Sequence, residues 1–319
     1  MLVQILILLA GLGLILLGAD YLVEGSSSIA KRSGVSEFVI GLTIVGIGTS
    51  APEMVVSLFS AIQGKPTMAI GNIIGSNIFN TALILGITAI ITPLVITKNN
   101  LKRDIPLNII VTMLLILFGL NKTLFGVGAD GLSRVDGALF LVIFALYLWS
   151  SFKHDDNSQD DDEVPAKSHP TWLSIIMITG GLAALIFGGK LFVNSATHIA
   201  SMAGVSDKFI AITVMAGGTS LPELATCVVA ALKGRGQLAL GNILGSNISN
   251  ILLILGSSSL VRPLAFKGIT PVDLGTVLLC AVFILLSAFI LGKNKITRTE
   301  GVILVLIEVA YMTWLIATV

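Results

Sequence analysis

A segment of about fifty residues occurs twice in this chain, 170 positions apart, and both copies lie in apolar surroundings. The copies run without a gap from Gly34 to Gly86 and from Gly204 to Gly256, and roughly half of the paired positions are identical. A repeat of this length indicates two halves of similar structure, with any shared site built from both.

The chain is far more apolar than a soluble protein. Hydrophobic residues make up 55% of its 319 residues, charged residues only 12%, and the mean hydropathy is +0.97. A membrane-spanning helix needs about 20 apolar residues. Segments of that kind lie near residues 2–23, 37–62, 69–93, 105–120, 135–152, 171–193, 208–232, 239–261, 271–291 and 300–318. Because these runs are long and continuous, we predict an all-α integral membrane protein with ten transmembrane helices rather than a β-barrel.

The repeat divides these segments into a first half, residues 1–151, and a second half, residues 171–319. An odd number of spans in each half makes the second half enter the membrane from the opposite side. We therefore predict two inverted five-helix repeats, related by a pseudo-two-fold axis in the membrane plane. Loops after the odd-numbered segments are richer in Lys and Arg, which places them in the cytoplasm and both termini outside it. We expect a multi-pass protein of the cell (inner or plasma) membrane.

Residues 152–170 join the halves and include the acidic run from Asp155 to Glu163. Such runs are usually solvated spacers. An EF-hand loop would need a glycine at its sixth position and a glutamate at its twelfth, and the run has neither. We therefore predict an acidic cytoplasmic linker. The formal net charge of +1 gives no reason to expect a nucleic-acid partner.

Each half carries the sequence Gly-Thr-Ser-x-Pro-Glu, at Gly48–Glu53 and Gly218–Glu223, within repeat motifs that span 43–86 and 213–256. Proline lacks an N–H group and clashes with the carbonyl four residues back. Together with the neighbouring glycines, this predicts breaks in the second and seventh helices. Carbonyls freed inside a membrane are tolerated where they line a polar cavity, and they are good ligands for hard cations.

The side chains of the motifs agree with a cation site. A glutamate at membrane depth is costly and points to function, and a threonine four residues earlier shares its helix face. In the following segments, oxygen-bearing side chains recur at a spacing of four: Asn72, Ser76 and Asn80, and Asn242, Ser246 and Asn250. A set of oxygens without His or Cys favours Ca²⁺ over zinc or copper.

Charge bounds what such a site can hold. Its two glutamates, with no basic residue inside the motifs, give a formal charge of about −2, which one Ca²⁺ or several Na⁺ would neutralise. Without a cation, two like charges in a low dielectric favour protonation of one of them. A site that must be filled before it reorients is suited to antiport. For the glycines, Asn72 and Asn242, helix packing alone is an open alternative.

These two motifs resemble the α-repeats of the sodium/calcium exchanger branch of the cation/calcium exchanger superfamily, and the resemblance covers the whole chain. It implies Na⁺/Ca²⁺ antiport, with the two ions as substrates and no cofactor, and helices one and six that slide across the rest. It implies central Ca²⁺ ligands Glu53, Glu223, Thr49 and Thr219. On one side, Na⁺ would meet Ser50, Ser76 and the carbonyl of Gly46, and on the other Ser220, Ser246 and the carbonyl of Ala216, with Asn80 and Asn250 between.

Other functions remain possible at this level. Proton/calcium antiporters resemble this chain in fold but typically have Gly-Asn-Ala-x-Glu in place of Gly-Thr-Ser-x-Pro-Glu. A cation channel would conduct without coupling to a counter-ion, whereas paired broken helices favour a carrier. The sequence shows no nucleophile–base pair or metal-ligand cluster, so we do not expect an enzyme.

Overall fold

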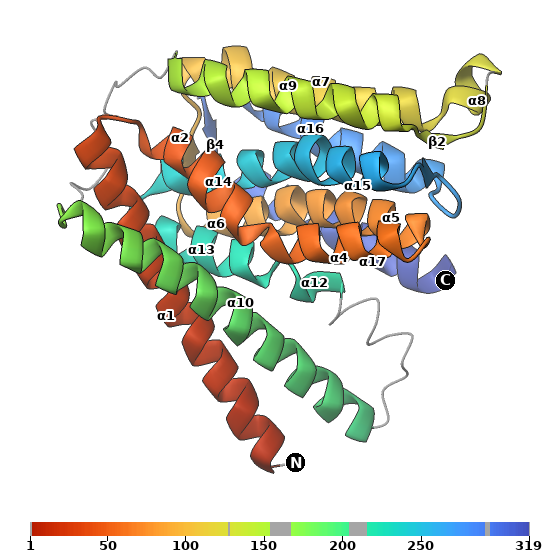
Figure 1. Ribbon diagram of the computed structural model, residues 1–319. Coiled ribbons are helices and arrows are strands. Elements are labelled where there is room, and N and C mark those ends of the chain that lie inside the picture. Colours follow the sequence, from red (N-terminus) through yellow and green to blue (C-terminus); the bar gives the residue numbers. More distant parts are fainter. Residues whose placement is uncertain (1, 127, 154–166, 204–215, 291–293, 319) are drawn as a thin grey trace.

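A computed structural model describes residues 2–126, 128–153, 167–203, 216–290 and 294–318 (Figure 1). Regular structure in these ranges is helical, apart from strands of two residues each. Most of the predicted linker and the start of the seventh predicted helix lie outside the described residues. The all-helical class predicted from the apolar runs is confirmed.

The first half begins with α1 (Leu2–Ser33). The next apolar segment comprises α2 (Glu37–Ile40), the π-helix η1 (Gly41–Val45), α3 (Gly46–Thr49) and α4 (Ala51–Ile62), and the following one α5 (Pro66–Ile78), the π-helix η2 (Phe79–Leu85) and α6 (Gly86–Ile91). After these come β1 (Leu94–Val95), the π-helix η3 (Asn100–Asp104), α7 (Ile105–Gly119), α8 (Asn121–Phe125), β2 (Gly131–Leu132) and α9 (Arg134–Lys153).

The second half begins with α10 (Thr171–Met202). It continues with α12 (Ala216–Gly218), α13 (Leu221–Leu232), α14 (Gly236–Ser249), the π-helix η5 (Asn250–Leu255), α15 (Gly256–Val261) and β3 (Leu264–Ala265). The chain then forms α16 (Pro271–Ile290), β4 (Lys295–Ile296) and α17 (Arg298–Thr318). Elements from α4 to β1 recur as α13 to β3 at the 170-residue offset of the sequence repeat.

Local sequence explains where several helices end. Both α4 and α13 stop before a glycine with positive φ, Gly64 (+75°) and Gly234 (+71°), a conformation that other residues rarely adopt. Before α9 and α16, Ser133 with Asp136 and Thr270 with Asp273 exchange side-chain and backbone hydrogen bonds, as in a capping box.

Short strands tie the loops of the two halves together. Strand β1 pairs antiparallel with β4, and β2 pairs antiparallel with β3. Each pair joins one strand from the first half to one from the second, so the halves are interlocked at the loops as well as through the helices.

The helices show that the protein crosses the membrane several times. Among the described residues, seven helices are long and apolar enough to span a bilayer. A further bent pair, Glu37–Thr49 with Ala51–Ile62, raises this to eight if it counts as one span. The pair bends by 48° at Ser50, which is the break predicted from Pro52. The corresponding interruption in the second half falls at Thr219 and Ser220, between α12 and α13.

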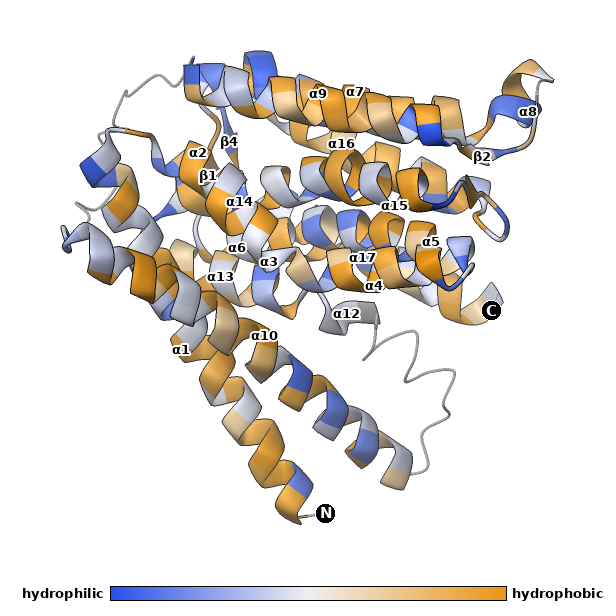
Figure 2. Ribbon diagram, in the orientation of Figure 1, coloured by the Kyte–Doolittle hydropathy of each residue, from blue (hydrophilic) through white to orange (hydrophobic). Residues whose placement is uncertain are grey.

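The most buried helices are the ones that carry the repeat motifs. In the segment from α14 to α15, 94% of the most apolar window is buried, compared with 22% in α1 and 17% in α17. Hydrophobic residues are frequent along the outer helices α1 and α9 (Figure 2). Exposed large side chains on the outer helices include Leu6, Leu16, Leu146 and Phe187. Lipid-facing helices thus enclose an inner pair of repeat-derived helices.

Helices α1 and α10 pack on each other more closely than on the rest and run obliquely to the other helices (Figure 1). Glycines line their contact. A Cβ added to Gly18 would lie 2.8 Å from the carbonyl oxygen of Gly181, and one added to Gly188 would lie 2.8 Å from that of Gly11. This close backbone approach is typical of membrane helices with small residues at seven-residue or four-residue spacing.

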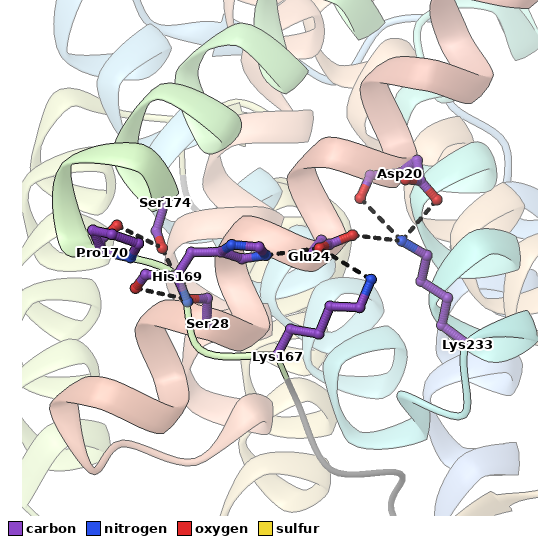
Figure 3. A network of polar contacts seen from close by, with 8 residues as sticks. All are labelled: Asp20, Glu24, Ser28, Lys167, His169, Pro170, Ser174 and Lys233. Carbon is purple, nitrogen blue, oxygen red and sulfur yellow. Dashed lines mark hydrogen bonds and ion pairs between the residues drawn. The ribbon is translucent and has the colours of Figure 1, made fainter.

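A polar network fastens one end of this helix pair to the rest of the protein (Figure 3). Lys233, directly after α13, lies 2.7 Å from the Asp20 carboxylate and 3.6 Å from that of Glu24, both on α1. Glu24 also contacts His169 Nε2 at 2.7 Å and Lys167 at 3.8 Å, in the segment that leads into α10. The network therefore connects α1, the entry to α10 and the end of α13.

The glycine contact predicts a matched pair of variants. Gly18→Ala should destabilise the protein by about 1–3 kcal/mol, because the new methyl group meets the backbone of α10. Gly13→Ala in the same helix meets no atom within 4 Å and should be nearly neutral. Thermal unfolding of the purified proteins in detergent measures both, and equal melting temperatures for the two variants would contradict the packing argument.

Candidate cation site

Glu53 and Glu223 lie in the first turns of α4 and α13, just after the two helix interruptions. Each side chain is 1% exposed. The N-terminus of a helix carries partial positive charge from its unpaired N–H groups, which favours a carboxylate there. The two breaks thus place an acid at a helix start deep inside the bundle.

Serines of opposite halves hold the two carboxylates. The Ser50 hydroxyl donates to Glu223 Oε1 at 2.9 Å, and the Ser220 hydroxyl donates to Glu53 Oε1 at 3.0 Å. Ser50 and Ser220 are equivalent positions of the repeat, as are Glu53 and Glu223. The same contact is therefore made twice with the halves exchanged, which is the pattern of a two-fold relation, and it brings both glutamates to one site.

Several buried oxygens of the predicted site residues have no hydrogen-bond partner among the described residues. They are Glu53 Oε2, Glu223 Oε2, Asn80 Oδ1, Asn250 Oδ1 and Thr219 Oγ1. Within the described part of the chain, no Lys, Arg or His forms an ion pair with either glutamate. Buried oxygens and charges are costly unless they are satisfied. A cation bound among these oxygens would supply the missing partner, so the oxygens fit the predicted cation site.

The two threonines of the motifs lie beside the breaks, Thr49 buried and Thr219 half-buried. Thr49 donates to the carbonyl of Val45 at 3.0 Å, and its hydroxyl lies 3.1 Å from Asn242 Oδ1 of the other half. Thr219 lies at the interruption between α12 and α13, one residue before the serine that binds Glu53. Their placement is compatible with the predicted role beside the glutamates.

The flanking groups combine differently from the expectation based on the resemblance. Ser76 lies near the serine of the other predicted set, 3.5 Å from the Ser220 hydroxyl, and 3.4 Å from Oε1 of Glu53 in its own half. The carbonyl of Gly46 instead accepts a hydrogen bond from Ser246 at 3.1 Å. These hydrogen bonds run across the predicted sets of Ser50, Ser76 and Gly46 and of Ser220, Ser246 and Ala216. Which of these groups share one ion stays a prediction.

Packing between the halves explains this exchange. Helix α14 lies along η1 and α3 of the first half, so Ser246 faces Gly46. A Cβ on Gly46 would lie 3.0 Å from the Ser246 backbone nitrogen, so the absence of a side chain permits this approach. Ala216 begins α12 directly after residues 204–215, which lie outside the described part, and the role of its carbonyl stays a prediction.

Asn72 and Asn242 brace helices within each half. Asn72 Nδ2 donates to the Ser57 hydroxyl at 3.0 Å, and Asn242 Nδ2 lies 3.2 Å from Cys227 Sγ. Ser57 and Cys227 are equivalent positions of the repeat. These contacts join α4 to α5 and α13 to α14, which favours the helix-packing interpretation of both amide nitrogens.

Two asparagines that were not among the predicted site residues contact two that were. Asn80 Nδ2 donates to Asn247 Oδ1 at 3.2 Å, and Asn250 Nδ2 donates to Asn77 Oδ1 at 2.9 Å. Each bond joins the two halves, and the second equals the first with the two copies of the repeat exchanged. Asn77 and Asn247 end the two copies of Gly-Asn-Ile-x-Gly-Ser-Asn, so the sequence marked them as repeated residues. Their position three residues before Asn80 and Asn250 gave no sign that each contacts the asparagine of the other half.

Glu308 is a buried acid that does not belong to this cluster. It lies in α17, is 5% exposed, and its Oε2 has no hydrogen-bond donor among the described residues. The repeat gives it no counterpart, in contrast to Glu53 and Glu223.

Paired interrupted helices that carry buried acids at matched positions of a repeat are typical of secondary cation transporters. The profile of the sodium/calcium exchanger protein family matches residues 3–153 and 173–317. The chain therefore belongs to the sodium/calcium exchanger family, whose members are transporters and not enzymes.

Individual relatives extend over nearly the whole length of the chain. It is 40% identical over 321 residues to a protein named as a putative antiporter, CaxA of Alkalimonas amylolytica, and the match covers 98% of each chain. It is 35% identical to the sodium/calcium exchanger MaX1 of Methanosarcina acetivorans, covering 97% of each. A solved structure of the sodium-calcium exchanger NCX_Mj superimposes with a TM-score of 0.84 at 33% identity, covering 98% of this chain and 99% of that one.

The reciprocal serine contacts generate a prediction. Ser50→Ala and Ser220→Ala should each weaken Ca²⁺ binding by roughly tenfold or more, because a hydrogen bond to a charged group is lost. The two losses should be similar, since the contacts are equivalent. Ser60→Ala, at the far end of α4, serves as the control and should bind as the wild type does. Equilibrium binding of radiolabelled Ca²⁺ to the purified protein would test this, and an effect in one serine variant alone would contradict the reciprocity.

Proposed function

We propose that this protein is a secondary active antiporter that exchanges Na⁺ for Ca²⁺ across the cell membrane by alternating access. The observation that carries the proposal is the pair of buried glutamates, each bound by a serine of the other half and each with one oxygen that lacks a donor among the described residues. Ca²⁺ and Na⁺ would be its substrates.

The oxygen ligands that the site offers are suited to Ca²⁺ and Na⁺. Carboxylate, hydroxyl, amide and carbonyl oxygens are the ligands that Ca²⁺ prefers, and the same oxygens suit Na⁺. Two carboxylates supply a charge of about −2, which either one Ca²⁺ or several Na⁺ can balance. Because both ions satisfy the same acids, they compete for them, and competition for one site is the basis of exchange.

The reciprocal contacts also support the proposed topology. It has ten transmembrane helices in two inverted repeats, residues 1–151 and 171–319, with helices two and seven broken. The acidic linker at 152–170 would be cytoplasmic and both termini extracytoplasmic. Contacts that recur with the halves exchanged are those expected from a pseudo-two-fold axis between such repeats.

Helices α1 and α10 are best placed to move during transport. They contact each other more extensively than any other pair of elements in the described ranges, and charged residues at one end connect them to α13, the helix that carries Glu223 (Figure 3). A unit packed mainly on itself can shift against the bundle without breaking the site. This agrees with the sliding of helices one and six implied by the family resemblance.

Proton/calcium antiport is the alternative that the site itself allows, since protons bind the same carboxylates. The Thr-Ser-x-Pro-Glu sequence and the name of MaX1 as a sodium/calcium exchanger favour Na⁺. A cation channel is less well supported, because paired broken helices around an enclosed site favour a carrier.

Radiolabelled Ca²⁺ uptake into proteoliposomes tests the coupling ion. Uptake should require internal Na⁺ and should be absent with internal K⁺ or choline at matched pH. Uptake that ignores Na⁺ but follows an imposed proton gradient would assign the protein to the proton-coupled branch. Uptake that needs neither gradient would indicate a channel.

Neutral replacements test the two acids. Glu53→Gln and Glu223→Gln should each abolish Na⁺-dependent Ca²⁺ uptake, because the site loses half of its charge while the side-chain shape is kept. Glu308→Gln removes another buried acid, outside the site, and should retain uptake. Size-exclusion chromatography checks that each variant is folded. Full uptake in Glu53→Gln or Glu223→Gln would contradict the assignment of these residues as cation ligands.

Acid should inhibit uptake, because protons and cations compete for the carboxylates of Glu53 and Glu223. Uptake by wild-type proteoliposomes should fall as the pH on both sides is lowered from about 8 to about 5. Raising the Ca²⁺ concentration should restore it, as competition requires. A rate that does not change across this range would show that protons do not reach the site.

A further inference from the structure

We propose that Asn77 and Asn247 are positioning residues, which turn the amide oxygens of Asn250 and Asn80 toward the cation site. This inference rests on the proposed cation site and adds residues to it that bind no ion themselves. All four asparagines are buried, with exposures of 0–3%.

The orientation of Asn250 follows from a chain of hydrogen bonds with one possible direction. A backbone carbonyl can only accept, and Asn77 Nδ2 donates to that of Asn247 at 3.1 Å. The amide oxygen of Asn77 therefore points the other way, and it accepts from Asn250 Nδ2 at 2.9 Å. With its nitrogen held there, Asn250 must present Oδ1 on its other side, where it has no donor among the described residues.

Asn80 is held in the same way by the other half. Asn247 Nδ2 donates to the Thr81 hydroxyl at 2.8 Å, so Asn247 Oδ1 is free to accept from Asn80 Nδ2 at 3.2 Å. Asn80 Oδ1 is likewise buried without a donor in the described ranges. The two arms differ in their anchors. A backbone carbonyl can only accept, so it fixes the direction of the first arm, whereas the Thr81 hydroxyl can also donate. In the structure both arms leave the amide oxygen of the equivalent asparagine without a donor.

This arrangement matters because an asparagine amide has two ends of opposite polarity. Its oxygen attracts a cation, whereas its NH₂ group repels one. Rotation by half a turn exchanges them at little steric cost, so sequence and shape alone do not decide which end faces the site. Asn77 and Asn247 decide it by binding the nitrogens, and each asparagine orients a ligand of the opposite half.

A double-mutant cycle separates this role from a structural one. Asn77→Leu removes the acceptor for Asn250 at similar volume and should raise the Ca²⁺ dissociation constant by roughly threefold to tenfold. In an Asn250→Ala background, the same change should have no further effect, because no amide is left to orient. The second cycle, Asn247→Leu with Asn80→Ala, should give the same result. If Asn77→Leu does not fold, Asn77→Ala replaces it.

The readout is equilibrium binding of radiolabelled Ca²⁺ to purified protein, with the melting temperature of each variant measured alongside. Asn100→Ala is the control: this buried asparagine exchanges hydrogen bonds with Thr97 in the segment that leads into η3, so its loss should lower the melting temperature without changing Ca²⁺ affinity. Strict additivity of the Asn77 and Asn250 effects would overturn the positioning role. Ca²⁺ binding by the wild type without Na⁺-dependent uptake would refute antiport and leave this test intact.

Discussion

The need to keep two carboxylates inside an apolar bundle governs this structure. Glu53 and Glu223 are each 1% exposed, without an ion-pair partner in the described part of the chain. They are stabilised by helix N-termini and by a serine from the opposite half, and Glu53 also by Ser76 of its own half. The first two depend on the interruptions at Ser50 and Ser220, because a continuous helix has no exposed N–H groups in its middle.

The same helix interruptions place polar groups of both halves beside the helix pair α1 and α10. They align hydroxyls, amides and carboxylates of both halves around one centre, while α1 and α10 pack mainly on each other through glycines at the edge of the bundle. A rigid oxygen-lined centre beside a separable helix pair is a suitable arrangement for alternating access. If α1 and α10 move as proposed, the network of Lys233 with Asp20 and Glu24 is the contact that connects them to helix α13, which carries Glu223.

The helical class and the break at Ser50 could be predicted because each depends on local properties. Apolar length predicts a membrane helix, and Pro52 predicts the bend. The grouping of Ser76 with Ser220, and of Gly46 with Ser246, could not be predicted in this way. It depends on which helix of one half lies along which helix of the other, and a repeat specifies equivalent positions without specifying which of them touch.

The sequence by itself determined which residues are candidates for the site, because a glutamate is too costly within an apolar segment to persist there without a function. Only the tertiary structure decided how they combine. Asn77 and Asn247 appear in the sequence as parts of the doubled motif, yet their contacts with Asn250 and Asn80 arise where two helices of different halves cross. Hydrogen bonds across such a crossing depend on the register between helices, which is set by packing and not by local sequence.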